Sequence, residues 1–192
     1  MTSRLIALTF VLPAGLLSQG FALRPETDAD IPFLLRLYAS TREEELAAVP
    51  WSAEQKQAFL AQQFDAQRQH YLNYIGACTF DVIEHNGEPA GRLYLDARPS
   101  SLHIVDVALL PAWRGHGVGA AILEGLQAAV GVSGKTVSTF VEKFNPALRL
   151  YRRLGFGEVA DHGIYLEMEW SSEAVLPSGA ASSPAIAGSF GS

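Results

Sequence analysis

A glycine-rich loop holds the residues whose types and spacing are best suited to chemistry. It reads Arg114-Gly115-His116-Gly117-Val118-Gly119 and lies between a predicted strand and a predicted helix. Glycine has no β-carbon, so the backbone N–H groups of such a loop can approach a ligand closely. The first N–H groups of a helix have no partner within the helix, and the helix dipole is positive there. The loop therefore predicts a site for phosphate oxygens, with Arg114 as an added cation.

Two other interpretations of the loop are open at this point. The glycines can simply form a tight turn before a core helix. Residues 115–120 also fit the Gly-x-Gly-x-x-Ala pattern of dinucleotide-binding folds, with Glu142 at the end of the next strand as the ribose-binding acid. Residues 111–114 argue against a dinucleotide site. They separate the strand from the glycines, whereas in a dinucleotide-binding fold the strand is followed by a tight glycine turn. The preceding strands also form an antiparallel meander instead of an opening βαβ unit.

The elements that must position this loop follow from hydrophobic periodicity and turn residues. Asn86-Gly87 predicts a hairpin turn, because both residues accept positive φ. Strands are predicted over residues 21–24, 80–84, 89–96, 102–110, 136–141, 156–159 and 164–170. Helices are predicted from Thr27 or Asp28 to about 40, from 52 to about 71, from the glycine loop to about 130, and from 145 to 154. This order predicts a mixed α/β domain.

The two ends of the chain differ from its middle. Arg4 precedes an apolar run from Leu5 to Leu17, which resembles a secretory signal peptide. The run is too short for an ordinary transmembrane helix, and Pro13 and Gly15 interrupt it. The favoured interpretation is an extension before the first strand or an upstream start codon. The predicted organisation is an apolar extension over residues 1–18, a folded domain over 19–170 and a disordered, Ser/Ala/Gly/Pro-rich tail over 171–192.

Composition excludes several classes of function. The 192-residue chain has a formal net charge of -6, which argues against nucleic acid as a partner, because phosphate backbones need clustered cations. Cys78 is the single cysteine, so the chain has no internal disulfide framework and no cysteine-based zinc site. The five histidines are scattered without metal-ligand spacing, and no metal is expected.

A second block of sequence helps to choose between the possible functions of the glycine loop. Residues Asn145–Phe156 read NPALRLYRRLGF, and Arg114, Gly117 and Gly119 match the pattern Arg/Gln-x-x-Gly-x-Gly/Ala. Together the two blocks resemble the GNAT superfamily of N-acetyltransferases, over about residues 21–170. The resemblance implies a central mixed, mostly antiparallel sheet of six to seven strands, a splayed central strand pair and about four helices. It also implies acetyl-CoA as the acyl donor, with no metal.

The resemblance implies which residues bind the acetyl-CoA donor. In this family the strand before the loop splays from its neighbour, and its backbone pairs with the pantetheine arm. Backbone N–H groups of the loop hold the pyrophosphate, and Asn145 either reaches the cofactor or only caps its helix. The implied cofactor-binding residues are Val107, Ala108, Leu109, Arg114, Gly115, His116, Gly117, Val118, Gly119, Ala120, Asn145 and Tyr151.

Tyr151 is the implied general acid. When an amine attacks the thioester, CoA leaves as a thiolate that needs a proton. A tyrosine is still protonated at neutral pH and can donate one. The alternative is a helical tyrosine that only packs.

The general base is less clearly marked. His103 lies eleven residues before Arg114, where some members of the family carry Glu or His. Alternation along a strand predicts that His103 shares a face with Val107 and Leu109, and that Asp106 lies on the other face. The alternative for His103 is a surface histidine near a strand start. The acidic run Glu43–Glu45 either attracts a cationic acceptor or is a solvated stretch.

The implied reaction is direct acetyl transfer to a primary amine of a small molecule or protein in a ternary complex, with Leu109 N–H stabilising the oxyanion. Cys78 is distant in sequence from both motifs, so no acetyl-enzyme is expected. The rival is a non-catalytic acyl-CoA-binding module. Because the cofactor is cytosolic, the protein is expected in the cytoplasm, without a membrane partner. Many relatives dimerise, so a homodimer is open, and no pattern identifies the acceptor.

Overall fold

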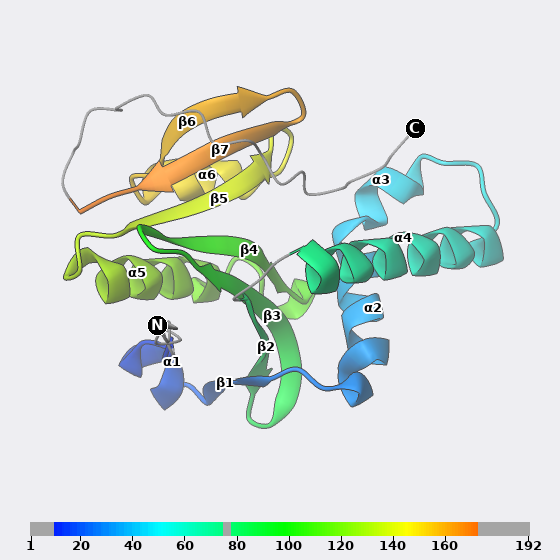
Figure 1. Cartoon of the computed structure of the whole chain (residues 1–192). Helices are drawn as coiled ribbons and strands as arrows, with labels where there is room; N and C mark the ends of the chain where they lie inside the picture. Colours follow the sequence, from blue (N-terminus) through cyan, green and yellow to red (C-terminus); the bar gives the residue numbers. More distant parts are fainter. Residues whose placement is uncertain (1–9, 75–77, 173–192) are drawn as a thin grey trace.

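The computed structural model describes residues 10–74 and 78–172 of the chain. These residues form one seven-stranded sheet in the order β1-β2-β3-β4-β5-β7-β6 (Figure 1). The pairing of β4 with β5 is parallel, and every other neighbouring pair is antiparallel. The predicted mixed, mostly antiparallel sheet is confirmed. The strands are β1 (Phe21–Pro25), β2 (Cys78–His85), β3 (Glu88–Ala97), β4 (Ser101–Leu109), β5 (Thr136–Glu142), β6 (Gly157–His162) and β7 (Tyr165–Trp170).

Helices cover the two faces of this sheet separately (Figure 1). The larger core lies on the face of α5 (Val118–Gly131), α6 (Leu148–Arg153) and α1 (Ala14–Ser18). The smaller core lies on the opposite face, under α2 (Ile31–Thr41) and α4 (Ala53–Tyr74). A short helix, α3 (Glu43–Ala47), joins α2 to α4. The described residues thus contain two α-helices beyond the four expected, α1 and α3, each of five residues.

Local sequence signals explain how the longer elements begin and turn. The hairpin between β2 and β3 turns at Asn86 and Gly87, with φ of 51° and 83°. Thr27 starts the first helical segment, and its backbone N–H donates to Asp30 Oδ2 at 2.8 Å. In α5 the apolar positions recur at helical spacing, and those at 122, 123, 126 and 130 are all buried. The predicted hairpin turn and the predicted Thr27 cap are both confirmed.

A β-bulge interrupts β4. Its pairing with β3 joins Asp106 to Tyr94 and Ile104 to Leu95, which leaves Val105 as an extra residue. One extra residue reverses which face the following side chains occupy.

The bulge overturns one prediction made from strict alternation. Ile104 lies in the core under α5, and Val107 and Leu109 pack against the same core. His103 and Asp106 therefore share the opposite face, on the side of α2 and α4. The predicted grouping of His103 with Val107 and Leu109 is wrong, because Val105 shifts the register between them.

The N-terminal segment packs against α5. Leu12 and Leu16 are buried in the larger core. A β-carbon added at Gly125 of α5 would lie only 2.7 Å from Pro13 Cγ. Residues 1–9, where the predicted apolar run begins, and residues 173–192 of the predicted tail lie outside the described residues. Within the described ranges no helix is both long and apolar enough to span a membrane.

Candidate functional site

A slot opens in the sheet where β4 and β5 separate. Their parallel pairing extends from Ser101↔Thr136 to Ile104↔Thr139. Beyond it, β4 continues beside β3 and β5 continues beside β7. No ladder joins residues 105–109 to residues 140–142, all of which the structure describes. The predicted splayed pair is confirmed, and its slot begins beside Thr139.

The backbone of β4 presents hydrogen-bonding groups to this slot. Leu110 N–H donates to the Ala90 carbonyl of the β3 side at 2.9 Å. Because successive residues of a strand point their N–H and C=O groups to opposite edges, those of Leu109 and Val107 face the slot. The groups of Ala108 face β3. The structure thus gives Val107 and Leu109 the backbone direction that the sequence resemblance implied.

The glycine loop closes onto the N-terminus of α5. Gly115 and Gly117 have φ of 75° and 83°, a left-handed conformation that other residues adopt only with strain. A β-carbon at either position meets nothing within 4 Å, so this side of the loop faces open space. The first bond within α5 runs from Ala121 N–H to Gly117 O at 2.9 Å. The N–H groups of residues 118–120 are therefore left without a helical partner, in the geometry that binds phosphate oxygens.

Trp113 holds the loop from the β1 side. It ends a 3-10 turn, Pro111–Trp113, between β4 and the glycines. Its ring packs against His85 at 4.2 Å and Phe21 at 5.2 Å between centroids. This turn is the spacer that had argued against a dinucleotide site.

The side chain of Arg114 holds the loop from the opposite side. Its Nε donates to the Leu109 carbonyl at 2.8 Å, and Nη2 donates to Ser40 Oγ at 2.7 Å. Arg114 therefore ties the loop to the C-terminal end of α2. Its predicted contact with phosphate, like that of His116, stays a prediction.

Tyr151 borders the slot on the α5 face. Its side chain lies in the larger core with 5% exposure, and its ring packs edge-on to Phe156. Burial raises the pKa of Tyr151 to about 12, although a side-chain hydrogen bond with Thr139 acts in the other direction. The negative charge of Asp106 adds to the increase in pKa. Tyr151 is thus a protonated phenol beside Thr139, the residue at which the slot begins.

Asn145 lies just before α6. Its Oδ1 accepts the backbone N–H of Ala147 at 2.9 Å, and its carbonyl accepts the N–H of Leu148 at 3.0 Å. The prediction that Asn145 is the N-cap is wrong, because the helix begins three residues later with Ala147 as its N-cap. The predicted cofactor contact of Asn145 stays a prediction.

His103 is an internal residue. It is 6% exposed, its Nδ1 lies 2.9 Å from Ser138 Oγ, and its ring packs against Phe140. Burial lowers the pKa of His103 to about 4, so the imidazole is neutral at physiological pH and a weak base. The surface-histidine alternative is therefore wrong, and the base role of His103 stays a prediction.

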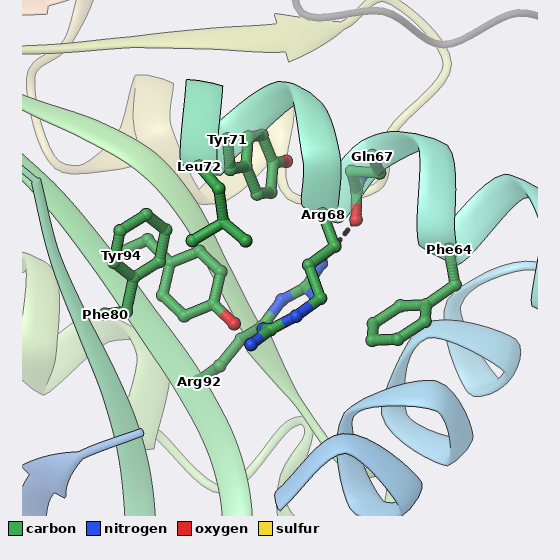
Figure 2. Close-up of a pocket in the computed structure, with 8 residues that line it drawn as sticks. All are labelled: Phe64, Gln67, Arg68, Tyr71, Leu72, Phe80, Arg92 and Tyr94. Atoms are coloured by element: carbon green, nitrogen blue, oxygen red, sulfur yellow. Dashed lines mark hydrogen bonds between the residues drawn. The ribbon is translucent and has the colours of Figure 1, made fainter. Parts of the chain in front are cut away.

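Asp106 is held by two side chains that the sequence analysis did not select. Its Oδ2 accepts the Tyr71 hydroxyl at 3.2 Å and forms an ion pair with Arg92. Arg92 is buried and also donates to Gln67 Oε1 at 3.0 Å (Figure 2). The available signal was a charged residue inside each of two apolar strands, Arg92 in β3 and Asp106 in β4.

A pocket lies beside Arg92, between α4 and the sheet. Figure 2 shows Arg92 at its centre, below Gln67 and Arg68 of the helix. Arg68 and Tyr94 both bind the carboxylate of Glu26. The lining residues are Phe64, Gln67, Arg68, Tyr71, Leu72, Phe80, Arg92 and Tyr94.

The acidic run Glu43–Glu45 forms the first turn of α3. Glu45 pairs with Arg42 at 2.9 Å, and Arg42 also reaches Glu142 at 3.5 Å. One member of the run is therefore already paired with a cation.

The thiol of Cys78 is poorly suited to act as a nucleophile. Burial raises the pKa of the Cys78 thiol to about 12, so the thiol is a poor nucleophile at neutral pH. Across residues 10–74 and 78–172 no group of three or more His, Cys, Asp or Glu side chains is arranged to hold a metal ion.

Comparisons with known proteins agree with this geometry. Residues 76–158 match the family model described as acetyltransferase (GNAT) domain. A sequence comparison with curated proteins found no match. Among solved structures, PaiA N-acetyltransferase from Thermoplasma acidophilum in complex with coenzyme A is 14% identical with a TM-score of 0.58, covering 78% of this chain and 97% of that one. An acetyltransferase from Thermus thermophilus is 19% identical with a TM-score of 0.55, covering 78% and 96%. RimL, the ribosomal L7/L12 alpha-N-protein acetyltransferase, is 16% identical with a TM-score of 0.51, covering 83% and 91%.

Proposed function

Because this chain carries a GNAT acetyltransferase domain, we propose that it transfers the acetyl group of acetyl-CoA to a primary amine. One observation supports the proposal most strongly. The partnerless N–H groups of α5, the slot between β4 and β5, and the buried phenol of Tyr151 lie next to one another on one face of the sheet. A phosphate site, an opening for a thioester and a proton donor are what such a transfer requires.

The donor is held mainly by backbone groups. The pyrophosphate binds the N–H groups of residues 118–120, where the helix dipole favours negative charge. The pantetheine arm lies along the slot and pairs with the N–H and C=O groups of Val107 and with the N–H of Leu109. The Leu109 carbonyl already accepts Arg114 Nε. The structural neighbour PaiA is described as a complex with coenzyme A, which supports this choice of donor.

The acceptor loses a proton to solvent and attacks as the free amine. The transfer then needs one proton donor and one oxyanion donor. Attack by the amine places negative charge on the thioester oxygen, and the N–H of Leu109 stabilises it. The thiolate of CoA then takes the proton of Tyr151, whose raised pKa keeps it protonated until that moment. Transfer is direct in a ternary complex, because the thiol of Cys78 is a poor nucleophile.

The acceptor is a primary amine of a small molecule or of a protein. RimL is described as acting on a protein α-amine, which keeps protein acceptors within the proposal. We place the reaction in the cytoplasm, where acetyl-CoA is available, with neither nucleic acid nor membrane as a partner. A homodimer is compatible with this function.

The test is thiol release from acetyl-CoA in the presence of an amine panel, with the acetylated product identified by mass spectrometry. The panel contains n-butylamine, 1,4-diaminobutane, lysinamide and a short peptide with a free N-terminus. We expect CoA to bind and at least one amine to be acetylated. If CoA binds tightly but no amine is acetylated, the chain is a non-catalytic acyl-CoA-binding module.

A further inference from the structure

The slot between β4 and β5 needs a connection at its open end. The two strands are joined only as far as the pair Ile104↔Thr139. In the described structure no backbone pairing joins residues 105–109 to residues 140–142, and each strand is held there by its outer neighbour, β3 or β7. Reacting atoms must come within roughly 3–3.5 Å of each other, so the separation of the two strands has to be fixed.

Ser40 connects the C-terminal end of α2 to β4. Arg114 Nη2 donates to Ser40 Oγ at 2.7 Å, and Nη1 donates to the Ser40 carbonyl at 3.2 Å. The same guanidinium donates through Nε to the carbonyl of Leu109, the last residue of β4, at 2.8 Å. The Ser40 hydroxyl donates to the Leu37 carbonyl at 2.7 Å, which fixes its direction. Arg114 thus joins the free end of β4 to α2.

Arg42 connects the same end of α2 to β5. Its Nη2 lies 3.5 Å from Oε1 of Glu142, the last residue of β5. Glu142 Oε1 also accepts the hydroxyl of Tyr165 in β7 at 3.3 Å. The side chains of Arg42 and Glu142 keep only 20% and 27% exposure, so solvent and salt screen this ion pair less than a fully exposed one.

The residues that make these two connections are held firmly by α2. Arg42 lies over the ring of Tyr38 at 5.8 Å, and Tyr38 is buried in the smaller core. Leu34 and Leu37 of the same helix are fully buried there. The free ends of both strands are therefore tied to one anchored helix end, at positions only two residues apart.

We infer that Ser40 and Arg42 form a clasp across the open end of the slot. Their partners are Arg114 on the β4 side and Glu142 on the β5 side. The clasp fixes the separation of the two strands, and Arg42 and Glu142 are positioning residues that do not touch the reacting atoms. This inference rests on the proposed acetyl transfer, because the clasp keeps the oxyanion donor of β4 at a set distance from the phenol beside β5.

The first experiment measures kcat and KM of the full chain for acetyl-CoA and for the best amine of the panel. Glu142→Gln keeps an acceptor for Tyr165 and removes the charge that binds Arg42. We expect kcat to fall roughly tenfold to hundredfold, because a small misplacement of reacting groups has a cost of this size. The KM for acetyl-CoA should change little, because the glycine loop is untouched.

Two substitutions of Arg42 separate its charge from its packing. Arg42→Met should lower kcat as Glu142→Gln does. Arg42→Lys keeps a cation of similar reach, so it should retain most of the wild-type kcat. Unchanged kcat in both Arg42→Met and Glu142→Gln would overturn the inference.

Glu45→Gln is the matched control. Glu45 is the other carboxylate that pairs with Arg42, at 2.9 Å, but it belongs to α3 and does not bridge the slot. Its side chain is 61% exposed. This variant should alter neither kcat nor KM. A loss equal to that of Glu142→Gln would show that Arg42 only stabilises α3, which overturns the clasp.

A double variant tests whether the two connections act as one device. Ser40→Ala alone should lower kcat by at least about threefold, because it removes one hydrogen bond from Arg114. A clasp released at one end no longer holds the other, so Ser40→Ala with Glu142→Gln should lose no more than Glu142→Gln alone. Independent sites would instead multiply their losses. Multiplied losses, or unchanged kcat in Ser40→Ala, would overturn the clasp.

Amide NMR signals of the CoA-free protein give a measurement that needs no activity. In Glu142→Gln we expect the signals of Val107 and Leu109 to shift, although these residues lie on the other side of the slot from the substitution. Unshifted signals would overturn the clasp while acetyl transfer stands. If the wild-type protein acetylates no amine of the panel, the proposed function fails, and the shifts still decide whether the clasp exists.

Discussion

At the scale of single residues, burial decides which titratable groups can take part. The same loss of solvent raises the pKa of Tyr151 to about 12 and lowers that of His103 to about 4. The phenol of Tyr151 therefore stays protonated at any physiological pH, and it gives up its proton only to a strongly basic group such as a thiolate. The lowered pKa makes His103 a weak base, because the imidazole releases a proton more readily than it holds one.

Tyr151→Phe removes the hydroxyl that we propose as the proton donor, and it keeps the ring that packs against Phe156. We expect kcat to fall by about 10²- to 10⁴-fold, the usual contribution of a positioned acid, while the affinity for CoA stays the same. Steady-state kinetics and calorimetric titration with CoA check the two parts. Unchanged kcat would remove Tyr151 from the mechanism.

His103 predicts a dependence of stability on pH. Its pKa in the folded state, about 4, lies below the unfolded value, so the unfolded chain binds the proton first as pH falls. His103 therefore costs nothing above about pH 6.5 and destabilises the fold by up to about 3 kcal/mol as pH falls towards 4.

Chemical denaturation at pH 7 and pH 5 measures this effect. In His103→Gln the free energy of unfolding should depend less on pH over this interval than in the wild-type protein. An identical pH dependence in both proteins would contradict the buried, neutral histidine.

Among the elements, the glycine loop and α5 form one unit, and glycine is present at positions 117 and 119 for different structural reasons. Gly117 is the N-cap of α5 and needs a positive φ. Gly119 lies inside the helix, and the nearest contact of an added β-carbon is Leu150 Cδ2 at 3.8 Å. The two positions therefore form a matched pair for testing the loop.

Gly117→Ala should weaken CoA binding by at least about tenfold, because left-handed backbone costs other residues about 1–2 kcal/mol and the new methyl group enters the phosphate space. Gly119→Ala should bind CoA as the wild-type protein does. Calorimetry with CoA measures both variants. Equal affinity of the two variants would contradict a phosphate site at this loop.

Most elements could be predicted because their signals are local. Asn86-Gly87 determines its hairpin, Thr27 begins its helix, and the spacing of apolar residues marks α5. The bulge at Val105 could not be predicted, because it depends on the pairing of β3 with β4 and not on either strand alone. The pairing of Arg92 with Asp106 follows from that register. Strict alternation along β4 placed Asp106 on the wrong face, so it was a weaker candidate for the general base than His103. Five-residue helices such as α3 are too short to show a helical period.

In the molecule as a whole, the N-terminal segment extends the core on the α5 face of the sheet. Leu12 and Leu16 pack with residues of α5 and of the sheet in one cluster. Pro13 approaches α5 where Gly125 leaves room for it. The segment therefore supports the helix at whose N-terminus we propose the phosphate site.

Gly125→Ala should destabilise the protein by about 1–3 kcal/mol, because its methyl group would overlap Pro13. Gly131→Ala in the same helix is the control, since its added carbon lies 3.5 Å from Trp170, an ordinary contact. The free energy of unfolding of both variants decides the question. Equal stability of the two variants would show that residues 10–18 contribute no packing to α5.

We expect CoA to bind along the slot between β4 and β5 and at the start of α5. The most direct measurement is a titration of the isotopically labelled protein with CoA, followed by the amide signals in NMR. The largest shifts should occur at residues 115–120, with further shifts at Val107 and Leu109. Binding of CoA that leaves these amide signals unshifted, and shifts those of Phe64–Leu72 around the α4 pocket instead, would exclude a CoA site at the slot and the glycine loop.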